Sequence, residues 1–404
     1  MIDLSPDQES AVQRIHEFFR GDEMLLTMGG FAGSGKTTVL SAAIGRMVDR
    51  PSIAFCALSG KAASVLKKKL EASGSLREDQ DYCGTIHGLM YEAERVRNSC
   101  TLDVKTTEEE EVAVRQPITE TTRQKIDWRV KGGEKYGVII IDEASMVNEE
   151  IYSDLVSLHT PIIAVGDHGQ LPPIGGRFNL MENPMIRLEK IHRQAEGDPI
   201  IKISMMARES GRIPIQRFGE DVEKIQATGR RDFASRIDRE TMVLCAKNDT
   251  RVWWNNALRS QYGYKDFDPM VGERVICLKN NHQAEIYNGM TGIIREISNS
   301  GKHWYWLSAE MDNGVLYTGK CLKHQFGSTS NLYNFTENGR PMAGREIGDL
   351  FDWGWATTVH KFQGSEAESV VVLEERLRGT EEDWKKWLYT AVSRSKKRLL
   401  IVGT

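Results

Sequence analysis

The chain has 404 residues, of which 40% are hydrophobic and 27% are charged, and its formal net charge is −4. This is ordinary globular composition, long enough for two or three compact domains, and its acidic balance gives no general support for nucleic-acid binding. No apolar run approaches the roughly 20 residues needed to span a bilayer, and the start Met1–Ser5 is acidic where a secretory signal is basic, so we expect a cytoplasmic protein with no membrane partner. The six cysteines are scattered without a Cys-x-x-Cys pair, which argues against a zinc site or a disulfide framework.

The first predicted element is a helix that begins near Pro6. Ser5 suits the N-cap, proline suits the first helical position, and the side chain of Gln8 can bond back to the N-cap backbone. This pattern is a capping box, so it predicts a helix start whatever else Gln8 does.

Short apolar runs alternate with helix-length amphipathic segments along most of the chain, which predicts an α/β fold. The runs are apolar at successive positions, as expected for parallel strands buried on both faces. The first group is Met24–Met28, Ile53–Ala57, Val138–Ile141 and Ile162–Val165. The second group is Met242–Cys245, Ala356–His360, Val370–Leu373 and Leu399–Val402. Two groups of strands predict two α/β domains.

The segment Gly30–Thr37 matches the phosphate-binding pattern G-x-x-x-x-G-K-[ST], directly after a predicted strand and at the start of a predicted helix. Its glycines let backbone N–H groups surround phosphate oxygens, and the helix N-terminus adds partial positive charge. Lys36 would reach the β- and γ-phosphates, and the Thr37 hydroxyl would ligate Mg²⁺. The candidate nucleotide-binding residues here are Gly30, Gly33, Ser34, Gly35, Lys36, Thr37 and Thr38.

Two acidic residues, Asp142 and Glu143, follow the strand Val138–Ile141. A carboxylate at the end of a strand can hold the Mg²⁺ shell, and the next can polarise the attacking water. We therefore predict Asp142 as a metal ligand and Glu143 as a catalytic residue of an NTPase.

Two stretches interrupt the α/β rhythm. Residues 91–135 are polar and contain the acidic run Glu108–Glu111, whereas residues 270–345 are rich in Gly and Asn and have the short alternating segments of an all-β insertion. The tryptophan pairs have spacings that fit a strand and a helix face, so core packing is favoured over base stacking. These pairs are Trp353 with Trp355 and Trp384 with Trp387.

Four further segments resemble the motifs of superfamily 1 helicases in the expected order. Gly166–Pro173 and Leu188–Gln194 resemble two motifs of the first motor domain, and Thr357–Glu366 and Leu388–Ser395 resemble the last two motifs of the second. The His-Lys-x-Gln-Gly core in the third segment is similar to the RecD-like branch, superfamily 1B, which also contains the Dda helicase of T-even phages. The resemblance covers essentially the whole chain.

The resemblance implies two RecA-like domains with a P-loop, each carrying an insertion. Domain one would comprise 1–90 and 136–195, with an accessory insertion at 91–135 that carries a strand-parting pin in this family. Domain two would comprise 196–269 and 346–404, with 270–345 resembling an SH3-like β-barrel. Thr101–Lys105 and Val112–Arg115 alternate as the two strands of a pin hairpin should. The acidic run between them instead suits a solvated loop, because carboxylates repel a phosphate backbone.

The resemblance also implies roles at the nucleotide. Gln170 would sense the γ-phosphate, Arg193 would touch it, and Arg394 would stabilise transition-state charge across the domain interface. Gln8 has two interpretations, since the family's glutamine at this place reads the adenine edge while the capping box explains the same residue without nucleotide. The implied catalytic residues are Lys36, Glu143, Gln170, Arg193 and Arg394, and the further nucleotide-binding residues are Gln8, Gly364 and Glu366.

For nucleic acid, the resemblance implies phosphate and sugar contacts, which carry no sequence information. Leu58-Ser59 stands where the family usually has Pro-Thr, so the hydroxyl survives although the local backbone differs. The candidate contacts are Ser59, Lys61, Thr85, His87, Thr358 and His360.

The function implied is an ATP-dependent helicase that uses Mg²⁺, moves along single-stranded DNA, 5′ to 3′ by family resemblance, and unwinds duplex junctions. We expect a monomer, with replication or recombination proteins as candidate partners. Two alternatives stay open at this point: a motor of the same superfamily that acts on RNA, and a nucleic-acid remodeller that hydrolyses ATP without unwinding.

Overall fold

The structure is a computed structural model of the whole chain. It describes residues 4–94, 127–130, 136–173, 178–189, 197–227, 229, 233–265, 267–281, 284–332 and 348–403, with only the backbone described for 91–94 and 127–130. The predicted pin strands and the segment that holds Arg193 lie outside the described residues. In the part that is described, no helix is both long enough and apolar enough to cross a membrane.

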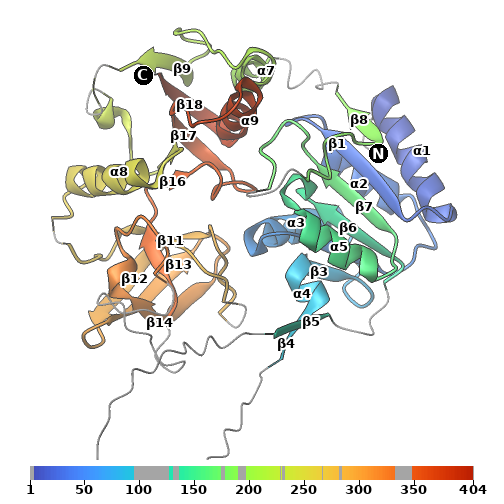
Figure 1. Cartoon of the computed structure of the whole chain (residues 1–404), viewed down its shortest axis with the longest axis horizontal. Helices are drawn as coiled ribbons and strands as arrows, with labels where there is room; N and C mark the ends of the chain where they lie inside the picture. The colour runs from blue at the N-terminus through green and yellow to red at the C-terminus, as the bar shows by residue number, and fades with distance from the viewer. Residues whose placement is uncertain are drawn as a thin grey trace, which may run out of the picture.

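Domain one is built on a six-stranded sheet in the order β3-β2-β6-β7-β1-β8, whose neighbours are all parallel (Figure 1). The strands are β1 (Leu25–Gly30), β2 (Ile53–Ala57), β3 (Tyr82–Thr85), β6 (Val138–Asp142), β7 (Ile162–Gly166) and β8 (Ile186–Leu188). The helices are α1 (Pro6–Arg20), α2 (Lys36–Gly45), α3 (Gly60–Ala72), α4 (Ile86–Met90) and α5 (Glu149–Ser157), with the 3₁₀ turn η1 (Ala144–Met146). All four predicted strands of this domain are present.

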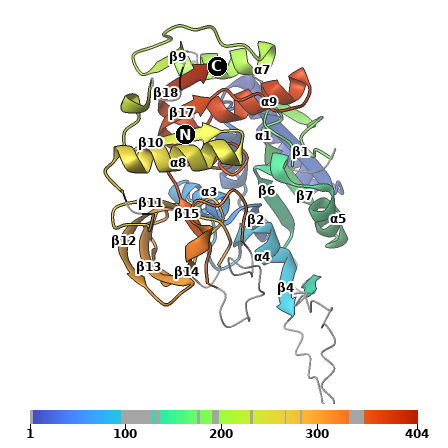
Figure 2. The same ribbon diagram turned by 60° about the vertical axis from the view of Figure 1, so that its left-hand side comes forward.

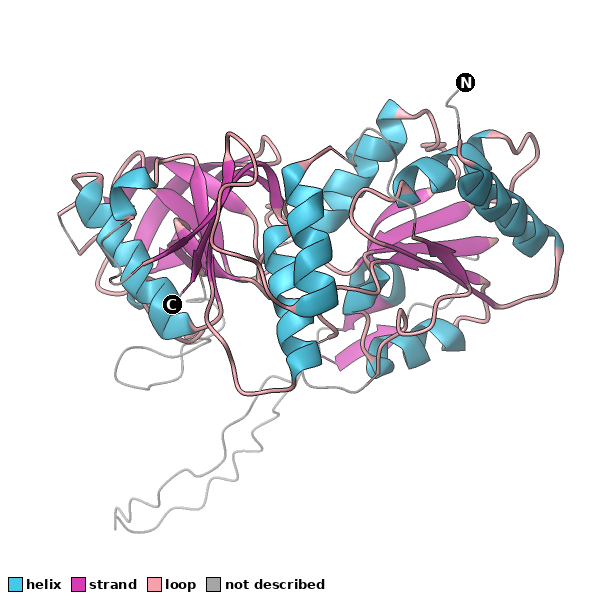
Figure 3. Cartoon of the chain, turned by 90° about the horizontal axis from the view of Figure 1, so that it is seen from above, coloured by secondary structure: helices cyan, strands magenta, loops and turns pink. Residues whose placement is uncertain are grey.

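Successive residues of the central strands belong to two different cores. Val138 and Ile140 pack in one cluster with α1, α2 and α3, whereas Ile139 and Ile141 pack in another with α4 and α5. Burial on both faces explains why the sequence is apolar at every position of β6. Figure 3, seen from above, shows helices on both sides of the strands.

Domain two has a five-stranded parallel sheet in the order β16-β10-β17-β18-β9. Its strands are β9 (Val222–Gln226), β10 (Thr241–Cys245), β16 (Ala356–Thr358), β17 (Ala367–Leu373) and β18 (Ser395–Gly403). Its helices are α7 (Pro199–Ser210), α8 (Asn248–Gln261) and α9 (Glu381–Val392), with the 3₁₀ turn η2 (Ala234–Arg236). Residues of α7 and α9 share one core, and those of α8 share the other.

The strand predicted at Ala356–His360 ends earlier than expected. Thr358 is the last residue of β16, because the chain turns there and the Phe362 N–H bonds to the carbonyls of both Thr358 and Val359. The tryptophan prediction is confirmed. Trp353, Trp355 and Trp387 are buried in cores, and Trp384 stacks on Trp387 with ring centroids 5.4 Å apart.

A five-stranded antiparallel sheet lies below domain two and beside α3 (Figure 2). Its order is β14-β13-β12-β11-β15, and Asp349, which precedes β15, bridges to Cys321 on β14, so the two edges meet at that point. The strands are β11 (Arg274–Cys277), β12 (Thr291–Asn299), β13 (Trp304–Met311), β14 (Leu316–Leu322) and β15 (Phe351–Trp353), with the 3₁₀ turn η3 (Lys323–Gln325). The sheet thus continues past residue 345, because Phe351–Trp353 pairs with β11.

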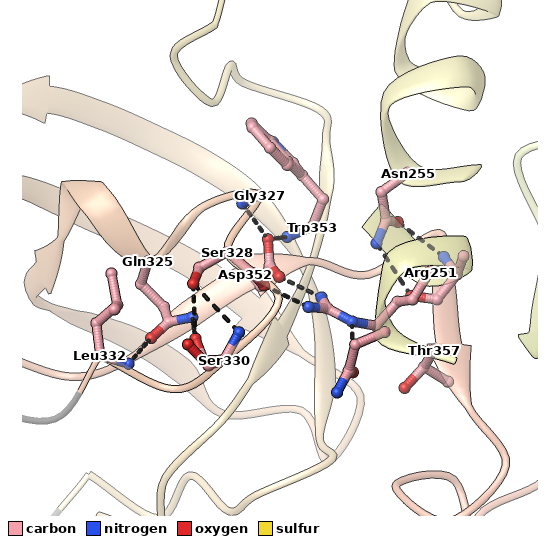
Figure 4. Close-up of polar contacts among 12 residues, drawn as sticks. Arg251, Asn255, Gln325, Gly327, Ser328, Ser330, Leu332, Asp352, Trp353 and Thr357 are labelled. Carbon is pink, nitrogen blue, oxygen red and sulfur yellow. Dashed lines mark hydrogen bonds and ion pairs between the residues drawn. The ribbon is translucent and has the colours of Figure 1, made fainter. Parts of the chain in front are cut away.

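Two buried ion pairs fix the antiparallel sheet to α8. Arg251 pairs with Asp352 on β15, as Figure 4 shows, and Arg259 pairs with Glu273, with 2.5 Å between Nε and Oε1. Asn255 of the same helix bonds to both the N–H and the carbonyl of Ala356. Because a buried ion pair is costly unless its geometry is kept, these contacts hold α8, β15 and β16 in one arrangement.

At the base of residues 91–135, β4 (Tyr91–Glu94) and β5 (Asp127–Val130) pair antiparallel, with Tyr91 opposite Val130. The ends of the predicted accessory insertion therefore leave domain one side by side.

Candidate nucleotide and nucleic-acid site

The phosphate loop follows β1 and ends at the first residue of α2. Gly33 and Gly35 have φ of 80° and 84°, a conformation that side chains with a Cβ rarely adopt. At Gly30 the constraint is space, since a Cβ there would lie 2.4 Å from Ser34 Oγ. The Lys36 ammonium donates to the carbonyls of Gly30 (2.7 Å) and Phe31 (3.2 Å). The glycines that the sequence singled out thus shape a loop that curls around its own lysine.

The loop has the features of a phosphate site. Ser34 Oγ within the loop and Gln170 Oε1 are buried and have no hydrogen-bond partner among the described residues. Buried polar atoms normally have a hydrogen-bond partner, so these two atoms are suited to contact a polar group of a bound ligand. The Thr37 hydroxyl and the Asp142 carboxylate are oxygen donors of the kind that Mg²⁺ accepts alongside phosphate and water. Thr38 follows on α2 and is half-buried.

Gln8 connects the first helix to the phosphate loop. The capping box is present, with the Ser5 N–H donating to Gln8 Oε1 at 3.2 Å. The side chain of Gln8 is buried, and its Nε2 donates to the Ser34 carbonyl at 3.2 Å. The capping interpretation is confirmed, while adenine contact stays a prediction.

We expect Gln8→Ala to raise the KM for ATP and to relax the preference for ATP over other nucleotides. The variant removes a buried amide that bonds both Ser5 and the loop, so the melting temperature should also fall by an amount matching about 1 kcal/mol. Nucleotide-dependent ATPase rates and thermal melts check this. If only the melting temperature changes, Gln8 is a cap and not a base contact.

Glu143 lies at the C-terminal end of β6 in an unusual setting. Its backbone has φ of 54°, rare for a residue with a side chain, and its N–H donates to Asp142 Oδ1 at 3.0 Å. Desolvation raises the pKa of the Glu143 carboxyl, and the Asp142 charge raises it further. The cations Arg394 and Lys36 oppose this rise. Residues from both domains therefore act electrostatically on this one carboxyl.

The loop that follows β7 of domain one is hydrogen-bonded to domain two. Asp167 is buried, and its Oδ2 accepts from the Tyr389 hydroxyl of α9 at 2.5 Å and from Gln170 Nε2 at 3.4 Å. The Leu171 N–H donates to Thr390 Oγ1 at 3.0 Å, and Gln363 Nε2 donates to the Leu171 carbonyl at 3.1 Å. The segment that contains Gln170 is thus held by three residues of domain two.

Arg394 follows α9 and is buried at the interface. Its guanidinium donates to the Thr390 carbonyl at 3.0 Å, to the Ser365 carbonyl at 3.4 Å and to Ser393 Oγ at 3.1 Å. These contacts fix its direction, and its charge acts on Glu143. Arg193, the other predicted arginine, lies outside the described residues.

The predicted nucleotide-binding residues of domain two, Gly364 and Glu366, lie away from the phosphate loop contacts described above. Gly364 has φ of 71° and lies against α3, where a Cβ would be 3.5 Å from that of Ala62 and 3.9 Å from Ser59 Oγ. Glu366 forms an exposed ion pair with Lys396 at 3.5 Å. Among the described residues, no hydrogen bond or ion pair joins Gly364 or Glu366 to the phosphate loop.

The predicted nucleic-acid contacts of domain one lie at the ends of neighbouring strands. Ser59 Oγ accepts from the Ala62 N–H at 3.1 Å and caps α3, and Thr85 Oγ1 accepts from the Gly88 N–H at 3.0 Å at the start of α4. Each hydroxyl keeps its own proton for donation. Because β2 and β3 pair with Ala57 opposite Thr85, the two hydroxyls share one edge of the sheet. The exposed His87 lies two residues after Thr85.

Thr358 and His360 lie at the end of β16 in domain two. Thr358 is buried, and burial lowers the pKa of His360, which favours the neutral imidazole. Gly364 of the same segment packs near Ser59, so the motifs of the two domains meet.

Lys61 has partners that the sequence did not predict. Its ammonium lies 2.7 Å from Asp312, in the turn between β13 and β14 of the antiparallel sheet, and 5.5 Å from the centre of the Phe362 ring. The ring of Tyr287 packs directly on Gly60, where a Cβ would be only 2.0 Å away. The sequence offers no signal for Asp312, whereas Tyr389 and Thr390 lie in a recognised motif but had no assigned role.

This geometry defines a two-domain P-loop NTPase in which the second domain supplies a buried arginine and holds the loop that follows β7. The family model described as an AAA domain matches residues 3–234, and the model of a UvrD-like helicase C-terminal domain matches residues 354–402. The chain belongs to this AAA-domain family and is a member of the superfamily 1B helicases.

Curated relatives agree with this assignment. The chain is 22% identical over 293 residues to the ATP-dependent RecD2 DNA helicase of Deinococcus radiodurans, covering 67% of this chain but only 36% of that protein. It is 22% identical over 457 residues to the RecBCD enzyme subunit RecD of Mycobacterium tuberculosis, covering 95% of this chain and 68% of the relative. The chain thus spans about a third of the first relative and two thirds of the second.

Solved structures share the fold. A Pif1 helicase from Bacteroides in complex with ADP-AlF3 and single-stranded DNA has a TM-score of 0.54 at 19% identity, covering 100% of this chain and 93% of that one. Another Pif1 structure, described for DNA unwinding at forked duplexes, has a TM-score of 0.54 at 18% identity, covering 99% and 92%. At this identity the likeness establishes the two-domain α/β fold.

Proposed function

We propose that this protein is an ATP-driven helicase that translocates on single-stranded DNA and unwinds duplex junctions. The observation that carries the proposal is a shared interface. The loop after β7, which contains Gln170, bonds to Gln363 and Tyr389 of domain two, and Ser59 meets Gly364 of domain two at the same interface. A change at the nucleotide can therefore move the two nucleic-acid motifs relative to one another.

The residues at the nucleotide have distinct tasks. Lys36 and the loop N–H groups neutralise phosphate charge, Glu143 orients the attacking water, and Arg394 stabilises charge in the transition state from the second domain. Thr37 and Asp142 would hold Mg²⁺, which would supply positive charge against the phosphates. Because Arg394 comes from domain two, hydrolysis requires the domains to close.

The strand would cross both domains at Ser59, Lys61, Thr85 and His87 and then at Thr358 and His360. Hydroxyl and imidazole contacts of this kind bind phosphate and sugar, and they fit a motor that ignores sequence. We further propose that the antiparallel sheet is an SH3-like module, supported by the bridge between Cys321 and Asp349 that brings its edges together. The insertion that β4 and β5 begin and end would carry the pin.

The choice of DNA rests on the Deinococcus radiodurans relative, which is named as a DNA helicase, and the 5′ to 3′ direction rests on the family resemblance. One experiment tests function and direction together. ATPase rates are measured with and without single-stranded DNA, and strand displacement is measured on 5′-tailed and 3′-tailed duplexes of DNA and of RNA.

We expect single-stranded DNA to stimulate hydrolysis and the 5′-tailed DNA duplex to be unwound. Displacement of RNA duplexes alone would identify an RNA motor, and stimulated hydrolysis without displacement would identify a remodeller. An ATPase rate that does not change when nucleic acid is added contradicts the proposal.

The ion pair between Lys61 and Asp312 leads to a further prediction. If Lys61 binds phosphate, Asp312 competes with the strand for it, so Asp312→Asn should tighten single-stranded DNA binding by about two- to five-fold, as expected for a partly exposed pair. The dependence of log K on log salt should steepen by about one. Titrations at several salt concentrations measure both quantities.

Glu310→Gln is the matched control, because it removes the same charge from the same sheet but leaves a different partner, Arg295. Equal affinities for the two variants would mean that Lys61 does not contact the strand.

A further inference from the structure

The hydroxyl of Tyr389 connects two parts of the nucleotide site. Tyr389 lies on α9 of domain two and is buried. Its Oη donates to Asp167 Oδ2 at 2.5 Å and accepts from the Ala32 N–H of the phosphate loop at 2.9 Å. Burial, with Asp167 beside it, raises the pKa of Tyr389 far above its usual value, so the hydroxyl keeps the proton that it donates.

The same part of the phosphate loop packs against domain two. Phe31 belongs to the hydrophobic core that α7 and α9 build, and its ring meets that of Tyr389 edge-on with centroids 6.3 Å apart. The guanidinium of Arg208 on α7 lies 3.6 Å from the centre of the Phe31 ring. Phe31 and Ala32 precede the glycine turns and the start of α2, so domain two contacts the first part of the loop.

Asp167 connects Tyr389 to Gln170, because its carboxylate accepts a hydrogen bond from each. Its Oδ1 accepts from the Gly169 N–H at 2.9 Å, and its Oδ2 receives both the Tyr389 hydroxyl and, at 3.4 Å, Gln170 Nε2. The Tyr389 bond is much the shorter of the two, and among the described residues the Gln170 Oε1 atom is buried without a hydrogen-bond partner. The hydroxyl therefore fixes the carboxylate that orients the glutamine, and the glutamine amide is weakly enough held to turn toward a phosphate.

We propose that Tyr389 is a positioning residue that couples closure of the two domains to hydrolysis by aligning the phosphate loop with Gln170 through one bridging hydroxyl. This inference rests on the proposed function, because it concerns the same nucleotide site. Opening of the interface breaks both bonds at once, so the loop and Gln170 lose their alignment together. The hydrogen bonds of Tyr389 therefore make ATP hydrolysis depend on closure of the two domains.

The test is Tyr389→Phe, which keeps the ring and removes the hydroxyl. In the full chain we expect the DNA-stimulated kcat to fall about ten- to a hundredfold, the size expected for one lost hydrogen bond to a charged group. The KM for ATP and the Kd for single-stranded DNA should stay within about twofold, since the bridge touches neither ligand. A merely structural role would move the melting temperature without this split between kcat and KM.

Tyr317→Phe is the matched control. It also removes a buried hydroxyl that donates to a carboxylate, Asp349 Oδ2 at 2.8 Å, but it lies in the antiparallel sheet. We expect its kcat to match the unsubstituted protein. A kcat for Tyr389→Phe equal to that of the control overturns the proposal.

Asp167→Asn supplies a second route if Tyr389→Phe folds poorly. It keeps the tyrosine and weakens the acceptor, so by itself it should also lower kcat. Where both variants fold, the two substitutions combined should cost no more in kcat than the larger single effect, because they break the same bridge. Fully additive effects would contradict the proposal. If the unsubstituted protein shows no stimulation by DNA, the proposed function fails instead, and the two failures are thereby distinguished.

Discussion

Lys36→Ala is expected to abolish ATP hydrolysis while leaving the fold intact. The Lys36 ammonium is the cation that the phosphate loop encloses, and it donates to the Gly30 and Phe31 carbonyls. Its removal takes away the charge that neutralises the β- and γ-phosphates, a loss on the order of 10²–10³ in kcat or more. The loop keeps the φ values of Gly33 and Gly35, so the α/β core should be unaffected.

Steady-state ATPase rates with and without single-stranded DNA check the prediction, together with a thermal melt. Lys67→Ala is the charge-matched control, because Lys67 is an exposed lysine of α3 that forms an ion pair with Glu71 on the same helix. Retained turnover in purified Lys36→Ala would remove the nucleotide site from this loop. A large fall in melting temperature would mean that the two carbonyl bonds of Lys36 serve the fold.

The buried parts of the two parallel sheets could be predicted from the sequence. Residues such as Val138–Ile141 are apolar at every position because alternate side chains pack with helices on opposite faces. The edge strands β3, β8 and β9 were not predicted, because they are short and only partly buried and carry polar residues such as Arg187 and Glu223. A strand with one neighbour needs less apolar sequence than a central one.

The phosphate loop could also be predicted from the sequence, because the residues that shape it lie close together in the chain. Gly30, Gly33 and Gly35 are required by space or by φ within eight consecutive residues, and a motif of that length carries its own geometry. The capping box of Gln8 is local for the same reason.

Contacts between distant segments could not be predicted. Asp312 meets Lys61 only because the antiparallel sheet is held against α8 by Arg251 and Arg259, and no pattern near residue 312 encodes that arrangement. Tyr389 could be recognised as part of a motif, but its bonds to Ala32 and Asp167 exist only once the two domains pack. These long-range contacts are also the ones that can join nucleotide chemistry to movement.

Glu143→Gln is expected to bind ATP and Mg²⁺ but to hydrolyse slowly, which would hold the domains closed. Only the carboxylate that orients and polarises the attacking water is lost, while Lys36, Thr37 and Asp142 remain. The fall in kcat should be about 10²–10⁴-fold, the usual contribution of a positioned general base. Single-turnover hydrolysis and binding of a fluorescent ATP analogue separate the two steps, and normal turnover would assign the water-orienting role to another residue.

The same substitution should stabilise the fold of the protein free of nucleotide and Mg²⁺. The pKa of Glu143 is raised by desolvation and then by Asp142, so ionisation of this carboxyl is harder in the folded than in the unfolded chain. Its protonated form therefore favours folding below the ordinary glutamate pKa of 4.5, and this contribution is lost as the pH rises through the folded-state value. Glutamine stays neutral, so Glu143→Gln should melt at a higher temperature than the unsubstituted protein at pH 7.5, and the difference should shrink as the pH falls toward 4.5. A variant that melts lower at pH 7.5 would mean that the ionised Glu143 is stabilised by Arg394 and Lys36 more than desolvation and Asp142 oppose it.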